Sequence, residues 1–217
     1  MAKLRNVADR TFGEYGEAGY RNLVTDDAYE ERRFQSSRAG RRKLRHELGL
    51  VADFLAGLPA NQLLLDAPCG MGRFTGLART LGHRPISLDL NVGMLQRAKA
   101  RHRGDTPLVQ GDVLALPFVD GTFDAAICFR LLHHLPDNLV LAVLTELKRV
   151  APRALVTFYD TRCLKYRRKR LLGKPVSGQY YPATHMLDLS RDAGWARGRH
   201  VNPLDIHRNL HALHLAS

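Results

Sequence analysis

The segment that most constrains the fold runs from Leu63 to Phe74 and reads LLLDAPCGMGRF. Three consecutive leucines are typical of a strand that is buried on both faces, as in a parallel sheet. Pro68, Gly70 and Gly72 then predict a sharp turn, after which apolar residues recur at helical spacing. We therefore predict a strand, a glycine-rich turn and a helix, which together form the first unit of a nucleotide-binding α/β sheet.

The turn itself does not identify a ligand. Its sequence, DAPCGMG, differs from the GxGxxG fingerprint of dinucleotide-binding enzymes, and no Gly-Lys-Ser/Thr follows at the spacing of a P-loop. Glycine lets a ligand approach the backbone closely, but it equally permits a tight turn that binds nothing. From this segment alone, both interpretations stay open.

Acidic residues end or follow the next predicted strands. Residues 86–89 read ISLD and end in Asp89, at the distance from the glycine turn where an acid accepts hydrogen bonds from ribose hydroxyl groups. Residues 106–110 predict a third strand, which leads toward Asp112. A fourth strand is predicted over residues 124–129, and its apolar composition indicates a central place in the sheet.

Five segments in order along the chain, DAPCGMG, DLNVGML, GDVLALPF, FDAAICF and LLHHL, together resemble the class I S-adenosylmethionine-dependent methyltransferases. The resemblance implies an α/β fold: one Rossmann-like domain whose seven-stranded, mostly parallel sheet has an antiparallel C-terminal hairpin and helices on both faces. It also implies a methyltransferase domain over residues 41–217, with a basic insertion at about 161–182. Residues 1–40 would form an N-terminal helical lid or substrate segment, unless they are a flexible leader.

Hydrophobic periodicity predicts the remaining elements. The helix predicted over residues 41–58 starts with Arg41, Arg42 and Lys43, which oppose the helix dipole unless the helix begins further upstream or meets an anion. Further helices are predicted at residues 92–101 (with Asn91 as N-cap), 139–150 and 183–193. Strands are predicted at residues 154–159, 195–201 and 210–215, the last two as an antiparallel hairpin.

The resemblance implies S-adenosylmethionine as the cofactor and assigns roles by position. Asp66 would meet the amino group of its methionine part, Asp89 the ribose hydroxyl groups, and Asp112 the adenine amino group. The expected cofactor-binding residues are Asp66, Ala67, Gly70, Gly72, Arg73, Asp89, Leu90, Met94, Asp112, Val113 and Phe129. Pro68 stands where the family often has glycine, so we expect a stiffer turn.

Methyl transfer to an alcohol or phenol needs a base that takes the acceptor's proton. His133 and His134 follow the fourth strand, at the sheet edge where such folds bind ligands, and histidine titrates near neutrality. We favour His134 as this base, with His133, Tyr159 and Asp160 as further candidates. The alternative is that a histidine only caps the following helix.

The chain is strongly basic, with a formal net charge of +12, and residues 162–174 contain several Arg and Lys side chains but no acid. Such a segment binds an anionic partner or is simply a solvated face. We expect a small-molecule or glycolipid acceptor that is anionic, for example phosphorylated, and peripheral contact with a membrane is a further option. The alternatives are an RNA methyltransferase and a non-catalytic, cofactor-binding regulator. Against the RNA methyltransferase, the chain lacks an Asn-Pro-Pro-Tyr-type motif for base amines.

Three scattered cysteines, no apolar run of bilayer length and no secretory signal lead us to expect a cytoplasmic protein. Histidines gather near the C-terminus, at His200, His207, His211 and His214. No carboxylate or cysteine stands at ligand spacing from them, so we predict no metal site. The oligomeric state is left open by the sequence.

Overall fold

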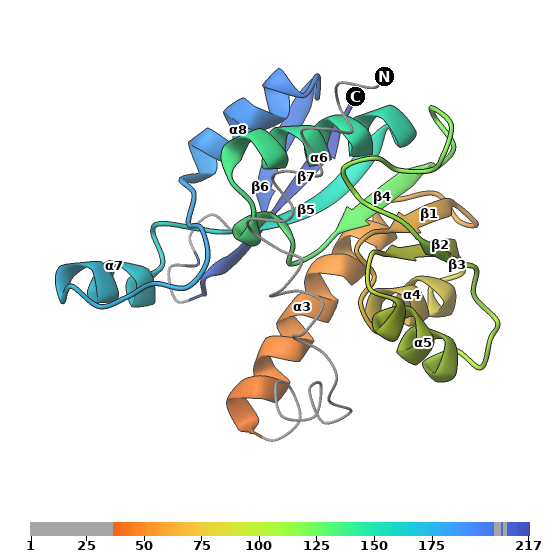
Figure 1. Cartoon of the computed structure of the whole chain (residues 1–217), viewed down its shortest axis with the longest axis horizontal. Coiled ribbons are helices and arrows are strands. Elements are labelled where there is room, and N and C mark those ends of the chain that lie inside the picture. The colour runs from red at the N-terminus through yellow and green to blue at the C-terminus, as the bar shows by residue number, and fades with distance from the viewer. Residues whose placement is uncertain (1–36, 202–204, 206–207) are drawn as a thin grey trace.

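The structure is a computed structural model that describes residues 37–201, 205 and 208–217 (Figure 1). The lid predicted over residues 1–40 therefore lies almost entirely outside the described residues, and so does His207. Among the described residues, no helix combines the length and the hydrophobicity needed to cross a bilayer.

Seven strands in the described part of the chain form one sheet, in the order β3-β2-β1-β4-β5-β7-β6. The strands are β1 Leu63–Asp66, β2 Arg84–Asp89, β3 Leu108–Gln110, β4 Ala125–Cys128, β5 Arg153–Tyr159, β6 Arg197–Val201 and β7 Leu210–Ala216. Strands β1 to β5 pair in parallel, whereas β7 pairs antiparallel with both β5 and β6. The predicted mostly parallel sheet with an antiparallel C-terminal hairpin is confirmed.

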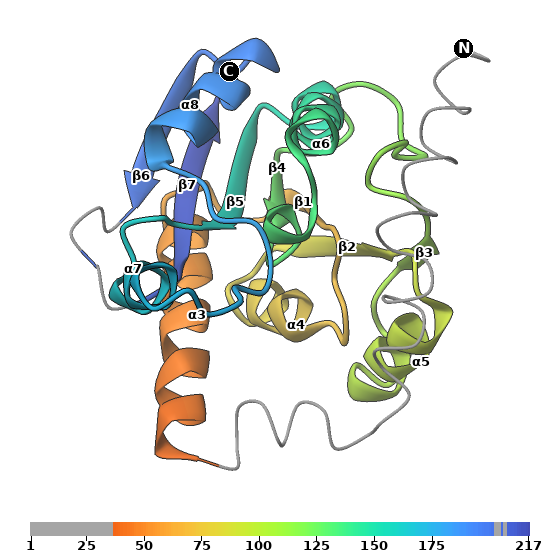
Figure 2. The ribbon, with the colours of Figure 1, turned by 60° about the vertical axis from the view of Figure 1, so that its left-hand side comes forward.

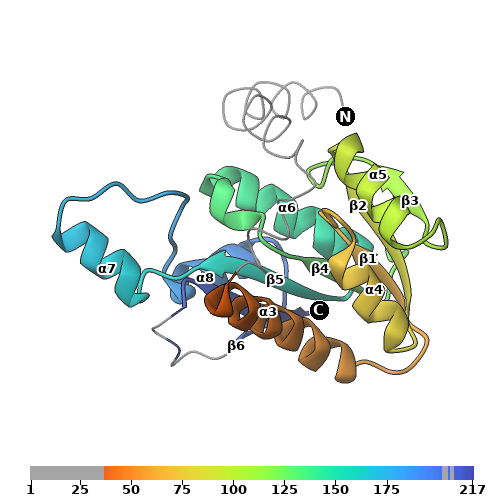
Figure 3. The ribbon, with the colours of Figure 1, turned by 90° about the horizontal axis from the view of Figure 1, so that it is seen from below.

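Helices lie on both faces of this sheet, as the sequence predicted. They are α3 Arg38–Ala56, α4 Arg73–Thr80, α5 Val92–Arg101, the short 3-10 helix η2 Leu132–His134, α6 Asp137–Val150, α7 Leu164–Leu171 and α8 Ala183–Asp192. Helices α3 and α4 cover one face, and α6 and α8 cover the other (Figure 2). Helix α7 has no buried residue and projects from the body of the molecule (Figure 3).

The alternation of side chains along each strand divides the core into two clusters. In β1, Leu64 packs in the cluster beneath α3 with Val51, whereas its neighbour Leu65 packs in the cluster beneath α6 with Val143. These four side chains are completely buried, and burying each such side chain stabilises the fold by roughly 1.5–3 kcal/mol. The doubly buried strands explain the uninterrupted leucine run that the sequence shows at this point.

The start of α3 answers the question raised by its basic residues. Ser37 is the N-cap, and its hydroxyl oxygen accepts a hydrogen bond from the Gly40 N–H group at 3.0 Å. The helix thus begins upstream of Arg41, so Arg42 and Lys43 lie beyond its first turn, where they oppose the dipole less, although Arg38 stands at its first position. The bounds of the other predicted elements hold to within three residues.

Candidate functional site

The candidate site lies where the strand order reverses. Strands β2 and β3 extend the sheet on one side of β1, and β4 and β5 extend it on the other, so the strand order reverses between β1 and β4, which is a topological switch point. All the residues predicted to bind a cofactor lie at or after the carboxyl ends of strands β1 to β4, which the parallel pairing brings to one edge. Their grouping at this edge follows from the fold.

Glycine stands at two positions of the turn after β1 for different structural reasons. Both adopt left-handed backbone conformations, with φ of 54° at Gly70 and 70° at Gly72. A Cβ atom on Gly72 would lie 2.6 Å from Nε2 of His102, whose ring is also hydrogen-bonded to the Gly72 carbonyl group. A Cβ atom on Gly70 would meet nothing within 4 Å. Gly72 therefore serves packing, whereas Gly70 borders open space that a ligand can use.

Asp66, at the end of β1, is a buried carboxyl group with one unsatisfied oxygen. Its side chain accepts a hydrogen bond from the Thr75 hydroxyl group at Oδ2, at 2.7 Å, and Thr75 in turn bonds to Ser87. Its other oxygen, Oδ1, has no hydrogen-bond partner in the described structure. Burial raises the pKa of Asp66 to about 7, although the Thr75 hydrogen bond opposes the rise. The free oxygen is suited to a cationic donor from a ligand.

The raised pKa makes folding stability depend on pH. An aspartate has a pKa of about 3.9 when unfolded, so the folded chain binds more protons until the pH passes about 7. Stability from this group is therefore lost as pH rises. Relative to Asp66→Asn, the parent's free energy of unfolding should fall by roughly 2.5 kcal/mol from pH 5 to 8, measured by urea titration. The control Asp188→Asn, at an exposed position, should show the same pH dependence of unfolding free energy as the parent. If Asp66→Asn also showed the parent's pH dependence, the raised pKa of Asp66 would be contradicted.

Asp89 is oriented by backbone groups. One carboxylate oxygen accepts a hydrogen bond from the Gly70 N–H group at 2.8 Å, and the other accepts one from the Asn91 N–H group at 2.9 Å. Asp89 is completely buried, which raises its pKa, while the backbone hydrogen bonds oppose the rise. Asp89 thus ties the end of β2 to the glycine turn. Its predicted role toward ribose stays a prediction.

Asp112 and Val113 follow β3, as the sequence indicated. Asp112 Oδ1 accepts a hydrogen bond from the Leu114 N–H group at 2.9 Å, which fixes a tight turn beside the site. Val113 is buried, and Phe129 after β4 packs against Phe74 with ring centroids 4.4 Å apart. These residues line the same sheet edge, and their contacts with adenine stay predictions.

An ion cluster of Glu47, Arg73, Arg130 and Tyr159 was missed from the sequence. One Glu47 oxygen binds the Arg73 guanidinium group at 3.0 Å, and the other binds that of Arg130 at 2.7 Å. Arg130 also donates to the Tyr159 hydroxyl group at 3.1 Å. This Glu47 cluster joins α3 to the glycine turn and to the ends of β4 and β5. The sequence signal that could have revealed this cluster is Glu47 itself, an acidic residue on the apolar face of the predicted helix.

The candidate bases lie in different environments. His133 and His134 form the end of η2, and their rings contact each other at 4.0 Å. His133 is buried and stacks on Tyr159 at 3.7 Å with an interplanar angle of 17°, whereas His134 is exposed. The structure therefore brings three of the four catalytic candidates together and leaves His134 the accessible histidine.

Asp160, the fourth candidate, is committed to other contacts. It is completely buried, and its carboxylate accepts hydrogen bonds from the Arg162 backbone and guanidinium groups at 2.7–3.2 Å. Burial would raise the pKa of Asp160, but the Arg162 hydrogen bonds outweigh that effect and hold the pKa below its usual value. A carboxylate held in this way is a weak proton acceptor.

A pocket of about 400 Å³ lies beside α7. It is lined by Tyr166, Arg170, Gly173, Lys174, Val176, Gly178, Gln179 and Tyr180. We call it the α7 pocket. Its volume falls in the range of small-molecule sites, and its lining combines two basic side chains with two tyrosines, whose rings stack at 4.4 Å.

Ring contacts join the α7 pocket to the sheet edge. Tyr180 in the pocket contacts Tyr159 at 5.1 Å, and Tyr159 stacks on His133, which contacts His134. The loop after α7 is also tied to η2, because the Gln179 N–H group donates to the His133 carbonyl group at 2.7 Å. The pocket and the candidate bases therefore form one continuous structural unit.

Comparison with known proteins identifies relatives of the central part of the chain. Residues 64–153 match the family model described as a methyltransferase domain. The chain is similar to malonyl-[acyl-carrier protein] O-methyltransferase of Erwinia billingiae, with 42% identity over 99 residues, or 45% of this chain and 38% of the relative. It is also similar to the 18S rRNA (guanine-N(7))-methyltransferase bud23 of Schizosaccharomyces pombe, with 29% identity over 62% of this chain and 49% of the relative.

The fold extends the similarity over nearly the whole chain. The crystal structure of magnesium protoporphyrin IX methyltransferase from Synechocystis PCC 6803 with bound SAH covers 98% of this chain and 100% of its own, with a TM-score of 0.67 and 17% identity. The first curated relatives are matched over only a quarter to about half of their own lengths.

Proposed function

We propose that this chain, which belongs to the class I S-adenosylmethionine-dependent methyltransferases, transfers a methyl group from that cofactor to a small anionic acceptor. Two features of the site fit the cofactor. The open space at Gly70 can take its methionine part, and the unsatisfied Oδ1 of Asp66 can accept a hydrogen bond from its ammonium group. When bound, the cofactor supplies a methyl group on a positively charged sulfur.

The residues of this chain contribute mainly by positioning. In a displacement of this kind the nucleophile must approach in line with the breaking bond, so a fixed acceptor lowers the barrier more than any single group does. The Glu47 cluster fixes the edge of the site through Arg73 and Arg130. His134, as the accessible histidine beside it, takes the acceptor's proton where the nucleophile is a hydroxyl group.

The α7 pocket is the observation that supports an anionic acceptor. Arg170 and Lys174 line it, and an arginine can bind a carboxylate or phosphate group with two parallel hydrogen bonds. The stacked tyrosines offer a surface for a flat or apolar part of the same molecule. Beside the pocket, Leu171 is 87% exposed and Leu172 is 52% exposed, which supports an amphiphilic acceptor such as a glycolipid.

Two pairs of basic residues in the segment 162–174 give a matched test. Arg170→Gln with Lys174→Gln removes the two charges that line the pocket, whereas Arg167→Gln with Arg168→Gln removes two charges that do not. We expect the first pair to raise the half-saturating acceptor concentration about tenfold or more, because charge-assisted hydrogen bonds are lost. Cofactor affinity should stay unchanged in both double variants, and the second pair should behave like the parent.

The assay follows methyl-labelled S-adenosylmethionine with two acceptor probes: the anionic small-molecule fraction of a deproteinised cell extract, and total RNA. The proposal requires label in the small-molecule fraction. Label in RNA, with both double variants equally impaired, would instead support an RNA methyltransferase, because phosphate contacts depend on total charge more than on position.

RNA is the second candidate acceptor because one relative is named as an rRNA methyltransferase and five of the eight residues of α7 are Arg or Lys. A small-molecule acceptor is preferred because Arg170 and Lys174 line one pocket of about 400 Å³, whereas RNA-binding surfaces are extended.

A further inference from the structure

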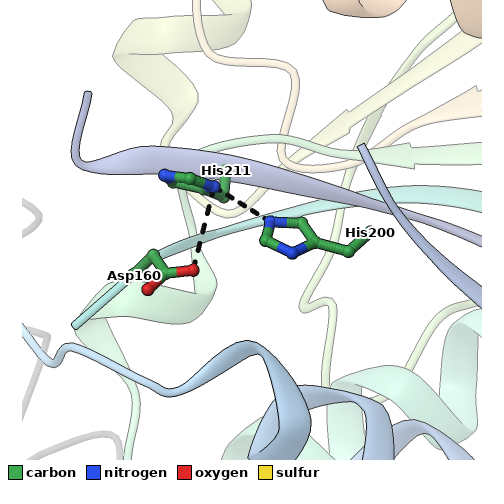
Figure 4. A group of neighbouring side chains, drawn as sticks. All are labelled: Asp160, His200 and His211. Carbon is green, nitrogen blue, oxygen red and sulfur yellow. Dashed lines mark hydrogen bonds and ion pairs between the residues drawn. The ribbon is translucent and has the colours of Figure 1, made fainter. Parts of the chain in front are cut away.

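Three potential metal ligands meet beside β5, β7 and β6, the last three strands in the order of the sheet. Asp160 follows β5, His200 lies on β6 and His211 lies on β7, and their side chains point toward one another (Figure 4). Asp160 is completely buried, His211 is 3% exposed and His200 is partly buried. The antiparallel pairing of β7 with both neighbouring strands brings these groups together, although they are far apart in sequence.

The ligand atoms have nearly the spacing of a tetrahedral metal site. Nε2 of His200 lies 2.9 Å from Nδ1 of His211, which lies 3.8 Å from Oδ2 of Asp160. All three atoms lie within 4.8 Å of one another. With metal–ligand bonds of about 2.0–2.2 Å, tetrahedral ligands are separated by roughly 3.3 Å. The two distances given above differ from this separation by about 0.5 Å or less.

Two of the ligands are already oriented by their other atoms. Nε2 of His211 lies 3.2 Å from the Arg208 carbonyl oxygen, which can only accept a hydrogen bond, so Nε2 carries the proton and Nδ1 offers a lone pair. Oδ1 of Asp160 accepts the Arg162 backbone N–H group at 2.7 Å, which leaves Oδ2 directed at the histidines. Histidine ligands in metal sites are commonly fixed by a backbone carbonyl group in this way.

A guanidinium group competes for the same position. Arg162 binds Oδ2 of Asp160 at 2.8 Å and lies 3.3 Å from Nδ1 of His200. Its side chain is 44% exposed, so it can move into solvent. When it leaves, His200 can carry its proton on Nδ1 and offer Nε2, which in the present arrangement donates to His211.

We propose that Asp160, His200 and His211 bind a Zn²⁺ ion, which displaces the Arg162 side chain. Two imidazoles and one carboxylate suit zinc, whereas magnesium and calcium prefer oxygen ligands alone. Three protein ligands leave a fourth position for water. The ion joins the ends of β5, β6 and β7 and thereby fixes the start of the segment that carries α7. The sequence-based expectation of no metal site rested on the lack of a carboxylate at ligand spacing, and Asp160 supplies one.

The test measures Zn²⁺ affinity of the full chain after dialysis against a chelator, by competition with a chromophoric chelator. We expect one ion per chain. His200→Ala and His211→Ala should each weaken binding more than about 100-fold, since even outer partners of metal ligands are worth about 10- to 100-fold. Arg162→Gln should bind about tenfold more tightly, because its charge-assisted hydrogen bonds no longer compete. His185→Ala, at a partly exposed histidine on α8, is the control and should bind like the parent.

Each other result overturns the proposal. Parent protein that binds no Zn²⁺, or binding seen only in Arg162→Gln, would mean that Arg162 holds this position permanently. Zn²⁺ binding that survives both histidine variants would mean that the ion binds at other residues. His200 is only partly buried, so His200→Gln is a second variant that keeps the fold if His211→Ala does not. Circular dichroism confirms folding of each variant. The result is independent of methyl transfer.

Discussion

Glu47→Ala is expected to lower the free energy of unfolding by about 3–5 kcal/mol, because it leaves two arginines without their shared counter-ion. The Glu47 side chain is 1% exposed, and those of Arg73 and Arg130 are 17% and 12% exposed. A small surface pair would be worth far less, but here two guanidinium groups would stay close together in a poorly solvated place. Urea unfolding at neutral pH measures the loss.

An exposed ion pair provides the control for this change. Asp188 pairs with Arg191 on α8, where the two side chains are 61% and 68% exposed. Asp188→Ala should therefore cost no more than about 1 kcal/mol. If Glu47→Ala were as mild as this control, the Glu47 cluster would not be what holds α3 against the site.

His134→Ala is expected to lower kcat by about 10²- to 10⁴-fold for a hydroxyl acceptor, with cofactor affinity unchanged. The structure separates this residue from its neighbour, because His134 is exposed whereas the His133 ring is buried and stacked on Tyr159. His133→Ala should therefore reduce stability as well as activity. The measurement is turnover with labelled cofactor, alongside calorimetric cofactor binding.

His185→Ala, at a partly exposed histidine on α8, again serves as a control and should turn over like the parent. Parent-like turnover in His134→Ala would exclude it as the base. The Tyr159 hydroxyl group, held by Arg130 at 3.1 Å, would then be the next candidate, and positioning alone would be the other explanation.

The fold could be predicted because its signals are local. A run of leucines, a glycine turn and an acid after each strand fix the first half of the sheet, since each strand and its turn are written in consecutive residues. Helix α5 begins at its predicted residue because the Asn91 side chain accepts a hydrogen bond from the Met94 N–H group at 3.2 Å. The antiparallel C-terminal hairpin was predicted and is confirmed, but the position of β7 between β5 and β6 was not predicted.

The rest depends on contacts between distant segments. Glu47 meets Arg130 across 83 residues, and Asp160 meets His200 and His211 only because β7 inserts between β5 and β6. No periodicity or spacing carries such information. The charge of the basic segment was visible in the sequence, but the pocket beside α7 depends on the loop that returns to η2 through Gln179. Residues of that loop have no motif.

Calorimetric titration with S-adenosylhomocysteine, the demethylated cofactor, tests the central claim most directly. Gly70→Ala places a methyl group in the open space assigned to the ligand, and Gly121→Ala is its matched control, because both glycines have positive φ and nothing within 4 Å of an added Cβ atom. Each change costs about 1–2 kcal/mol of backbone strain, so stability should fall alike in both variants. We expect the parent and Gly121→Ala to bind with equal affinity and Gly70→Ala to bind at least about tenfold more weakly, a loss of about 1.4 kcal/mol or more. A parent that does not bind, or a Gly70→Ala variant that binds like Gly121→Ala, would contradict the placement of the cofactor at this turn.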